Sequence, residues 1–346
     1  MILYIRLRHR ARLFCETPVM FLLYGIFLSV VTCFCWGSTS FLMRGIRKLD
    51  AAEMSLTRAC GGLLCGALLL FAKNAQLTPV TRFEVFIFLA LVICNNILGD
   101  VFLFFSIRLL GVARGSAISS TYPICVAIVS YLIYDAPLTP AIAGGTLSVV
   151  AGVALLCRKG KEERPLSFWG LASAAAASVF WAAGLLLNKE LLVCGLNPAT
   201  IVLGRGVAFF GAASAVWFFH AFFVKKKARP WRAFLRRDSA LGVTAGACSL
   251  GLGAWFYSLA LQYVPPTVAT PIGASNPVLA SLFSTLVYKD KIEPAQWVGI
   301  VFAVGGRCWW RCSGALSLSR AGSYGVEQPS GVRRAAVSPR CRFRLF

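Results

Sequence analysis

The chain consists largely of apolar runs of about 20 residues, separated by short polar breaks. A run of that length lets a helix cross a hydrocarbon core of roughly 30 Å. Because the bilayer interior offers no water, a crossing segment must satisfy its own backbone hydrogen bonds, and only helices and closed barrels do so. With 58% hydrophobic and 14% charged residues, the sequence predicts an all-α polytopic membrane protein.

Ten such runs are predicted to be transmembrane helices, in two sets of five. They cover residues 21–43, 51–72, 83–107, 113–134, 139–157, 168–190, 198–223, 239–261, 266–288 and 294–310. A polar linker, 158–167, is expected to join a first unit, 21–157, to a second unit, 168–306, whose last helix is expected to be truncated. Residues 1–20 then form a basic N-terminal leader, and residues 307–346 form an arginine-rich, irregular C-terminal tail.

The second unit repeats part of the first at a constant offset of 154 residues. The matches include prolines and glycines, which chance seldom aligns in apolar sequence: Pro123, Ser130, Tyr134 and Gly145 return as Pro277, Ser284, Tyr288 and Gly299. Because each unit has an odd number of helices, consecutive copies must enter the membrane in opposite directions. The sequence therefore predicts two inverted five-helix repeats, a design of many secondary transporters.

The formal net charge is +22, and much of it lies in the two terminal segments. Basic residues beside membrane spans usually reflect orientation and contact with anionic lipid headgroups. Nucleic-acid binding is not indicated, because no soluble module interleaves basic and aromatic residues. The expected partners are a small-molecule solute and membrane lipids, and a homodimer is left open.

Metal, disulfide and covalent chemistry are also not indicated. The 13 cysteines include no CxxC pair, and most lie singly in or beside apolar runs, where cysteine behaves as a small hydrophobe. With only two histidines, a membrane-embedded enzyme would lack a paired base or a metal set, so it is the weakest function class. No cofactor is predicted.

A set of short motifs resembles the drug/metabolite transporter superfamily, specifically two EamA-type domains in tandem. The motifs are Phe34-Cys-Trp-Gly-Ser-Thr-Ser40, Arg58 in the second helix, Pro123 in the fourth, and Asp135 with Leu138 and Thr139 before the glycine-rich fifth. The family more often has glutamate at the place of Asp135, and in the second copy Asp290 is the nearest acid. The resemblance covers about residues 21–306. It implies ten helices, a central cavity between the halves, and carrier-type movement of small metabolites, amino acids or drugs.

Asp100 is the clearest ionisable residue inside an apolar run, and such residues default to functional hypotheses because burying them is costly. One interpretation is a proton- or cation-coupling site. The other is a static partner for Arg58 or Arg108, and this is favoured somewhat because the repeat position holds Ala254.

Arg58 and its repeat mate Arg205 are expected in the first turns of the second and seventh helices. Their forked guanidinium groups are candidates to bind a carboxylate or phosphate of a solute in the cavity. Alternatively, each side chain reaches a membrane interface or holds a helix end.

Pro123 and Pro277 each remove a backbone hydrogen bond, so they are expected to kink the fourth and ninth helices. Polar residues stand directly before them, ending in Tyr122 and Asn276. A broken or kinked helix at corresponding positions of two repeats points to a binding site, although packing alone would also explain a kink.

Aromatic residues in the apolar runs are further candidates for the cavity wall. Trp36, Trp181 and Tyr257 are predicted to line it and to stack on an apolar or cationic solute. Lipid-facing or interfacial positions are the equally ordinary alternative.

These patterns predict a secondary transporter of small metabolites that works by alternating access around a midplane cavity, with proton coupling left open, in the plasma (inner) membrane. The main alternative is an ion channel or divalent-cation permease. That alternative should show rings of intramembrane acids, and only Asp100 qualifies.

Overall fold

The computed structural model describes residues 2–72, 77–134, 139–156, 167–225, 234, 237–288, 297–299 and 301. All regular elements in these ranges are helical, which confirms the predicted all-α class. In chain order they are α1 (Ile2–Arg44), α2 (Ala51–Ala72), α3 (Arg82–Val92), η1 (Ile93–Leu98), α4 (Gly99–Leu110), α5 (Val112–Ser119), α6 (Tyr122–Tyr134), α7 (Pro140–Leu156), α8 (Phe168–Val193), α9 (Pro198–Phe219), η2 (His220–Val224), α10 (Arg237–Gly246), η4 (Ala247–Gly253), α11 (Ala254–Ala260), α12 (Pro266–Ala274) and α13 (Asn276–Tyr288).

Seven helical stretches in the described part of the chain are long and apolar enough to cross a membrane. They are Met20–Arg44, Ala51–Ala72, Arg82–Leu110, Arg114–Ile133, Phe168–Val193, Pro198–Val224 and Arg237–Ala260. Ile142–Leu155 is a shorter apolar helix, and α12 with α13 forms a further helical pair that is interrupted at Ser275. The predicted tenth helix and the tail 307–346 fall mostly or wholly outside the described residues, so the number of ten stays a prediction.

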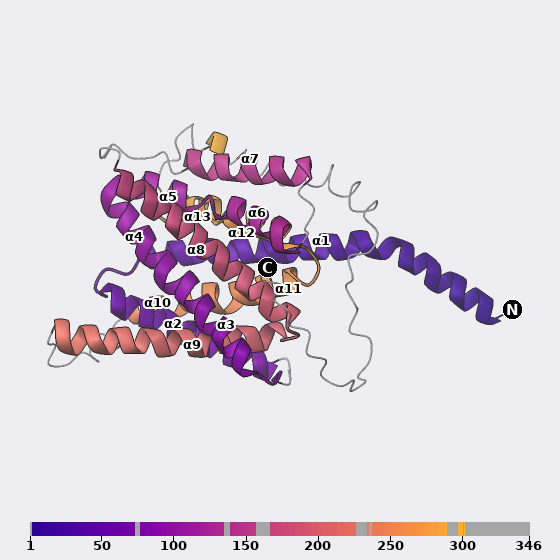
Figure 1. Ribbon diagram of the computed structural model, residues 1–346, viewed down its shortest axis with the longest axis horizontal. Coiled ribbons are helices and arrows are strands. Elements are labelled where there is room, and N and C mark those ends of the chain that lie inside the picture. The colour runs from indigo at the N-terminus through magenta and orange to yellow at the C-terminus, as the bar shows by residue number, and fades with distance from the viewer. Residues whose placement is uncertain are drawn as a thin grey trace.

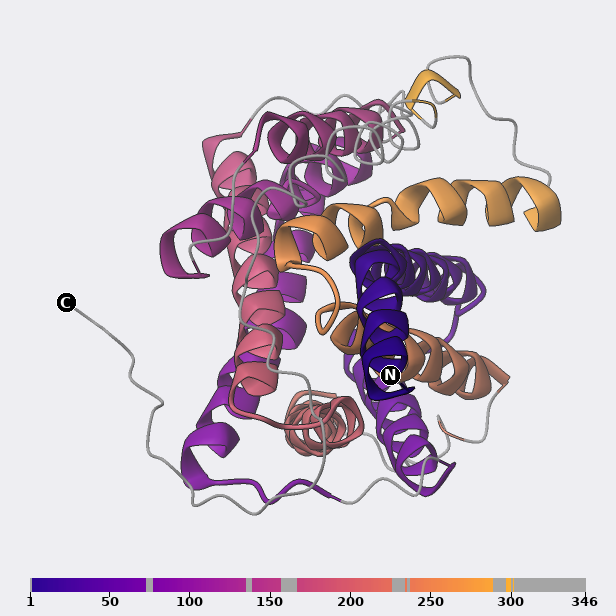
Figure 2. The same ribbon diagram turned by 90° about the vertical axis from the view of Figure 1, so that its right-hand side faces the viewer.

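The helices of the two sequence halves interleave. α2 packs along α9, α8 packs along α4 and against α5 and α6, and α1 packs against α11, η4, α12 and α13. Figure 1 shows α4 and α8 crossing in the centre, with α7 and α9 at opposite edges, and Figure 2 shows the same bundle turned by 90°. The interface between the halves therefore runs through the middle of the bundle.

Both halves interrupt the same two helices at positions 154 residues apart. The π-helical segments η1 and η4 widen the third helix of each half at matching positions. The breaks before α6 and α13 also match, because the hydrogen bonds Thr121 N–H to Ile118 O and Ile124 N–H to Thr121 O recur as Ser275 N–H to Ile272 O and Val278 N–H to Ser275 O. These local geometries repeat with the sequence, while the opposite direction of the two halves stays a prediction.

Each half also presses a tryptophan onto a glycine of the other half. Trp181 lies against Gly99 at the end of η1, and Trp36 lies against Gly253 at the end of η4. A Cβ atom on Gly253 would come within 2.7 Å of the Trp36 indole. Glycine is therefore required for this close approach, and the two contacts join the halves in a reciprocal manner.

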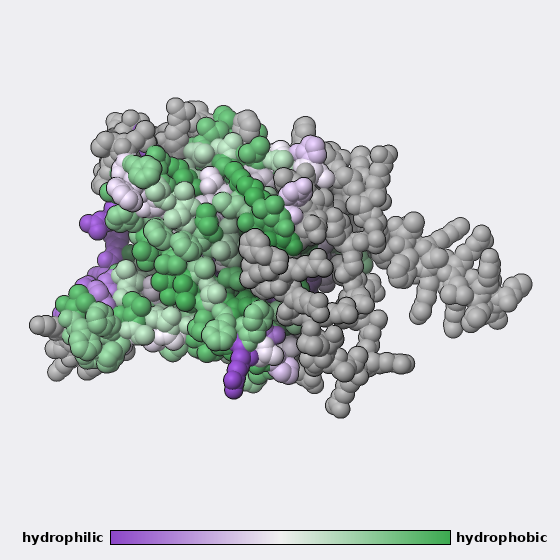
Figure 3. Space-filling model, in the orientation of Figure 1, coloured by the Kyte–Doolittle hydropathy of each residue, from purple (hydrophilic) through white to green (hydrophobic). Residues whose placement is uncertain are grey.

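Apolar side chains cover most of the described surface that Figure 3 presents, over α4, α8 and α9. On these three helices Phe104, Val179 and Val207 each have roughly half or more of their surface exposed. Hydrophilic side chains gather at the left-hand end of the view, where α1 and α4 end. An apolar belt with a polar end is the distribution that a lipid bilayer selects.

Replacing Gly61 by alanine is expected to lower stability, because its Cβ would clash with the backbone carbonyl of Val243 on α10. Overpacking against a backbone atom that cannot move cheaply costs about 1–3 kcal/mol. Gly211→Ala is the matched control, since nothing lies within 4 Å of a Cβ at that site on α9. Thermal unfolding of the purified variants should show a lower Tm for Gly61→Ala alone. Equal Tm values for the two variants would contradict the packing of α2 on α10.

Candidate functional site

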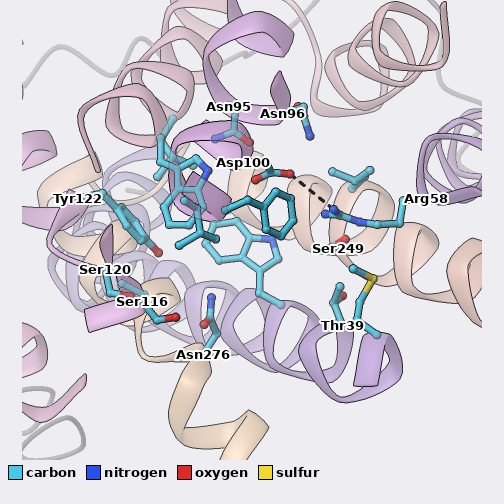
Figure 4. Close-up of a pocket in the computed structure, with 18 of the residues that line it drawn as sticks. Thr39, Arg58, Asn95, Asn96, Asp100, Ser116, Ser120, Tyr122, Ser249 and Asn276 are labelled. Atoms are coloured by element: carbon cyan, nitrogen blue, oxygen red, sulfur yellow. Dashed lines mark ion pairs between the residues drawn. The ribbon is translucent and has the colours of Figure 1, made fainter. Parts of the chain in front are cut away.

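A cavity of about 430 Å³ lies between the two halves, a volume typical of small-molecule sites. Its wall is built from both halves and mixes charged, amide, hydroxyl and aromatic groups. The lining residues are Trp36, Thr39, Met43, Arg58, Asn95, Asn96, Asp100, Leu103, Phe104, Ser116, Ser120, Tyr122, Trp181, Leu185, Arg205, Ser249, Leu250, Ala274 and Asn276. Figure 4 shows the labelled polar side chains converging on one space. Among the residues that the structure describes, no group of three or more His, Cys, Asp or Glu side chains is arranged to hold a metal ion.

Asp100 faces Arg58 across the cavity, and the dashed line in Figure 4 marks their ion pair. Arg58 Nη1 lies 3.6 Å from Asp100 Oδ2, and the two side chains are 18% and 26% exposed. This separation is longer than a charge-assisted hydrogen bond of about 2.7–2.9 Å. Of the two partners weighed for Asp100, the structure therefore brings Arg58 to it, through a loose contact that is open to the cavity.

Arg205 is buried and held by two amides. Its Nη2 donates to Asn95 Oδ1 at 2.8 Å and to Asn96 Oδ1 at 3.2 Å. The π-helical geometry of η1 allows this arrangement, because Gly99 N–H bonds to the Cys94 carbonyl five residues earlier and so brings Asn95 toward the face of Asp100. Arg205 is also within electrostatic range of Arg58 and Asp100. One acid and two guanidinium groups thus share a single site.

The guanidinium groups keep unused donors. Within the described residues, the buried Nε atoms of Arg58 and Arg205 have no hydrogen-bond partner. An unpaired buried donor costs about 1–3 kcal/mol, and more when the group is charged. Each arginine therefore carries a donor that this conformation leaves unsatisfied.

Aromatic rings line the deeper part of the cavity. Tyr122 meets Trp181 edge to face with ring centroids 5.9 Å apart, and Trp36 lies 5.6 Å from Tyr257. Tyr257 differs from the other three, because it is 1% exposed and its hydroxyl is hydrogen-bonded to Thr270 Oγ1 at 2.8 Å. It lies behind Trp36 and does not line the cavity.

The two prolines lie beside the cavity, and their neighbours Tyr122 and Asn276 line it. Each proline is the second residue of a new helix, α6 or α13, and each follows a turn. The expected mid-helix kink is therefore replaced by a break, since proline is tolerated in the first turn of a helix where its missing N–H is not needed. Of the candidate residues, Trp36, Arg58, Asp100, Tyr122, Trp181, Arg205 and Asn276 share the cavity wall.

Sequence reasoning did not single out Asn95, Asn96, Thr39, Ser116 or Ser249 as site residues, yet all five line the cavity. Two consecutive asparagines inside an apolar run were an available signal, because buried amides need partners. Asp135, Leu138 and Asp290, which the family motif emphasises, lie outside the described residues.

An apolar cluster closes one end of the site. This sealing cluster comprises Leu28, Tyr122, Val126, Ala182, Leu185, Leu186, Tyr257, Ala260, Leu261, Val264, Val268, Ala269, Ile272 and Ala274. Of the other lining residues, Met43 is the next-to-last residue of α1, and Phe104, in the middle of α4, is 51% exposed.

The EamA-like transporter family model matches residues 23–158 and again residues 168–309. The chain belongs to the EamA-like transporter family. Two copies of the family model cover most of the sequence, so the chain is a multi-pass membrane protein, and the family points to a transporter rather than an enzyme.

Curated relatives and a solved structure agree with this family. The chain is 27% identical over 195 residues to the uncharacterized inner membrane transporter YhbE of Escherichia coli K12, covering 51% of this chain and 59% of YhbE. It is 31% identical over 71 residues to the probable 4-amino-4-deoxy-L-arabinose-phosphoundecaprenol flippase subunit ArnE of Escherichia coli 55989, covering 20% of this chain and 64% of ArnE. The chain thus spans less than two thirds of the length of these relatives. A crystal structure that is 15% identical matches with a TM-score of 0.68 over 86% of this chain and 99% of the other, and shows the same fold.

Asn95→Ala is expected to lower stability by about 1–3 kcal/mol, because it removes the shorter of the two amide acceptors from buried Arg205. Asn276→Ala is the matched control: the Asn276 side chain lines the same cavity but makes no hydrogen bond to the described residues. Thermal unfolding in detergent should give a lower Tm for Asn95→Ala than for Asn276→Ala. The reverse order would contradict the bond between Asn95 and Arg205.

Proposed function

We propose that the chain is a secondary transporter of a small solute, which binds in the cavity between the two halves and reaches either side of the inner membrane by alternating access. The central support is the cavity itself, a charged and polar space enclosed by apolar helices and built from both halves. Ionisable residues inside membrane helices mark solute or ion pathways in most proteins that contain them. No covalent step is needed, because binding and conformational change suffice for this activity.

Two features of the helices support a rocking of the halves. The sealing cluster shares Tyr122, Leu185 and Ala274 with the cavity wall, whereas Met43, next to the end of α1, lines the cavity outside this cluster. The breaks at Ser120–Thr121 and Ser275 lie at matching positions, and a break in a helix is a point at which it can bend. Discontinuous helices at a repeat interface are a device of alternating-access carriers. We therefore infer that the opposite state opens the sealing cluster and closes the end near Met43.

Reconstitution tests the proposal directly. Purified protein in liposomes, offered radiolabelled amino acids, sugars, organic anions and organic cations, is expected to show saturable uptake of at least one solute. Uptake should be accelerated when unlabelled solute is present inside, since a carrier returns faster when loaded. Arg205→Ala should reduce it at least about tenfold by removing a buried binding group, and Gly211→Ala should leave it unchanged. Flux that neither saturates nor responds to internal solute would contradict a carrier and favour a channel.

Asp100 is our candidate for proton coupling. Its carboxylate faces Arg58 of α2, lies in electrostatic range of Arg205 of α9 and beside the Trp181 indole of α8, and shares the cavity wall with the Tyr122 hydroxyl. A carboxylate that can exchange its arginine partner for a proton is able to link solute and proton binding.

Asp100→Asn is expected to abolish the effect of a pH gradient on uptake while exchange of labelled for unlabelled solute continues. Uptake measured with and without the gradient, in wild-type and variant liposomes, checks this outcome. Gradient dependence that persists in the variant would remove Asp100 from coupling and leave it as a static partner of Arg58.

A further inference from the structure

The cavity carries an unbalanced charge. Among the described residues that line it, the two basic groups of Arg58 and Arg205 outnumber the one acidic group, Asp100. The second half does not restore the balance, because Ala254 stands at the repeat position of Asp100. With Asp100 ionised, one positive charge is therefore left without a counter-charge among the described residues of the wall. In a site surrounded by apolar helices that excess is costly unless a mobile anion compensates it.

Resting on the transport function proposed above, we propose that the cavity selects solutes carrying a single negatively charged oxyanion group, which bridges Arg58 and Arg205. Arg205 is fixed by Asn95 and Asn96 through one terminal nitrogen, and this leaves other guanidinium donors for a ligand. Within the described residues, Arg58 is held by the 3.6 Å contact with Asp100, so an oxyanion can compete for it. A guanidinium presents paired N–H donors that match two oxygens of a carboxylate or phosphate.

In this arrangement Asp100 sets the charge of the preferred solute. With Asp100 ionised, the wall has one excess positive charge and favours a monoanion over a dianion, a zwitterion or a cation. Asn95 also sets the charge of the preferred solute. An aspartate of nearly equal shape at position 95 would neutralise the guanidinium of Arg205, which the asparagine leaves charged. The two positions thus allow the cavity charge to be raised or lowered by one unit with almost no change of volume.

Four forms of the full chain test this inference: wild type, Asp100→Asn, Asn95→Asp and the double variant. Ligand-induced thermal shifts are measured with three probes that share a phenyl ring: 3-phenylpropionate, phenylalanine and 2-phenylethylamine. We expect wild type to respond best to the monoanion. Asp100→Asn should bind it about tenfold or more tightly, and Asn95→Asp about tenfold or more weakly, as expected for one nearby charge in a partly desolvated site. The double variant, with the wild-type charge count, should recover the anion preference.

Quenching of tryptophan fluorescence supplies a second measurement, which does not require a solute whose shape fits the cavity. Trp36 and Trp181 lie on the cavity wall, so iodide should quench their share of the emission more than caesium does, with acrylamide as the neutral reference. Trp36→Phe and Trp181→Phe identify that share. The excess of iodide quenching over caesium quenching should rise in Asp100→Asn and fall in Asn95→Asp. Equal quenching by iodide and caesium, or the same result in both charge variants, would overturn the inference.

A lipid phosphate and a soluble organic acid offer the same oxyanion chemistry, and competition separates them. Phosphatidylglycerol that displaces 3-phenylpropionate, where phosphatidylcholine does not, would assign the site to a lipid headgroup; no displacement would assign it to a soluble acid. A failure of anion selection can also be distinguished from a failure of the proposed transport function. A chain that moves only cations would refute anion selection but keep the carrier, whereas anion binding without any exchange would refute the carrier alone.

Discussion

The structure depends on how it accommodates charge inside an apolar bundle. Arg205 is buried about two turns into α9, and a buried guanidinium is tolerated only where acceptors or water replace its hydration. The chain supplies two amide acceptors from a widened turn of the third helix, and one carboxylate a turn later at Asp100. This requirement explains why the polar groups of three different helices converge on one point. The π-helical turn of η1 presents Asn95 and Asn96 for this role, and the turn itself recurs in η4, where Leu250 stands in place of Asn96.

The two halves share their backbone features, and the positions at which their sequences differ supply the charged and amide groups of the site. The π-helical segments, the breaks before Pro123 and Pro277, and the crossed contacts of Trp36 with Gly253 and Trp181 with Gly99 occur in both halves. The polar residues of the third helix do not, because Asn96 and Asp100 correspond to Leu250 and Ala254. A duplicated backbone therefore encloses a site whose charge is contributed unequally. In such a protein, a few residues that differ between the halves determine selectivity, while packing contacts that occur in both halves close the cavity.

Much of this site could be predicted from sequence, because charged residues are rare in apolar runs and each one requires a reason. Arg58, Asp100 and Arg205 were identifiable on that ground alone, and Trp36 and Trp181 as aromatic residues inside apolar runs. Tyr257 was placed wrongly on the wall, since a helical run does not reveal that Trp36 covers it. The expected kinks at Pro123 and Pro277 are breaks, because the chain leaves the helix at the preceding turn. The roles of Asn95 and Asn96 depend on a π-helical turn that sequence periodicity does not indicate.

The central claim is that binding between the halves changes access from one end of the bundle to the other. Distances between spin labels attached at both ends test it most directly, with one pair at Arg114 and Arg237 near the open end and one at Val80 and Gln262 near the sealing cluster. Solute or anion that reaches the cavity should shorten the first distance and lengthen the second within one population. Distances that stay fixed at both ends, or that change in the same direction, would contradict alternating access.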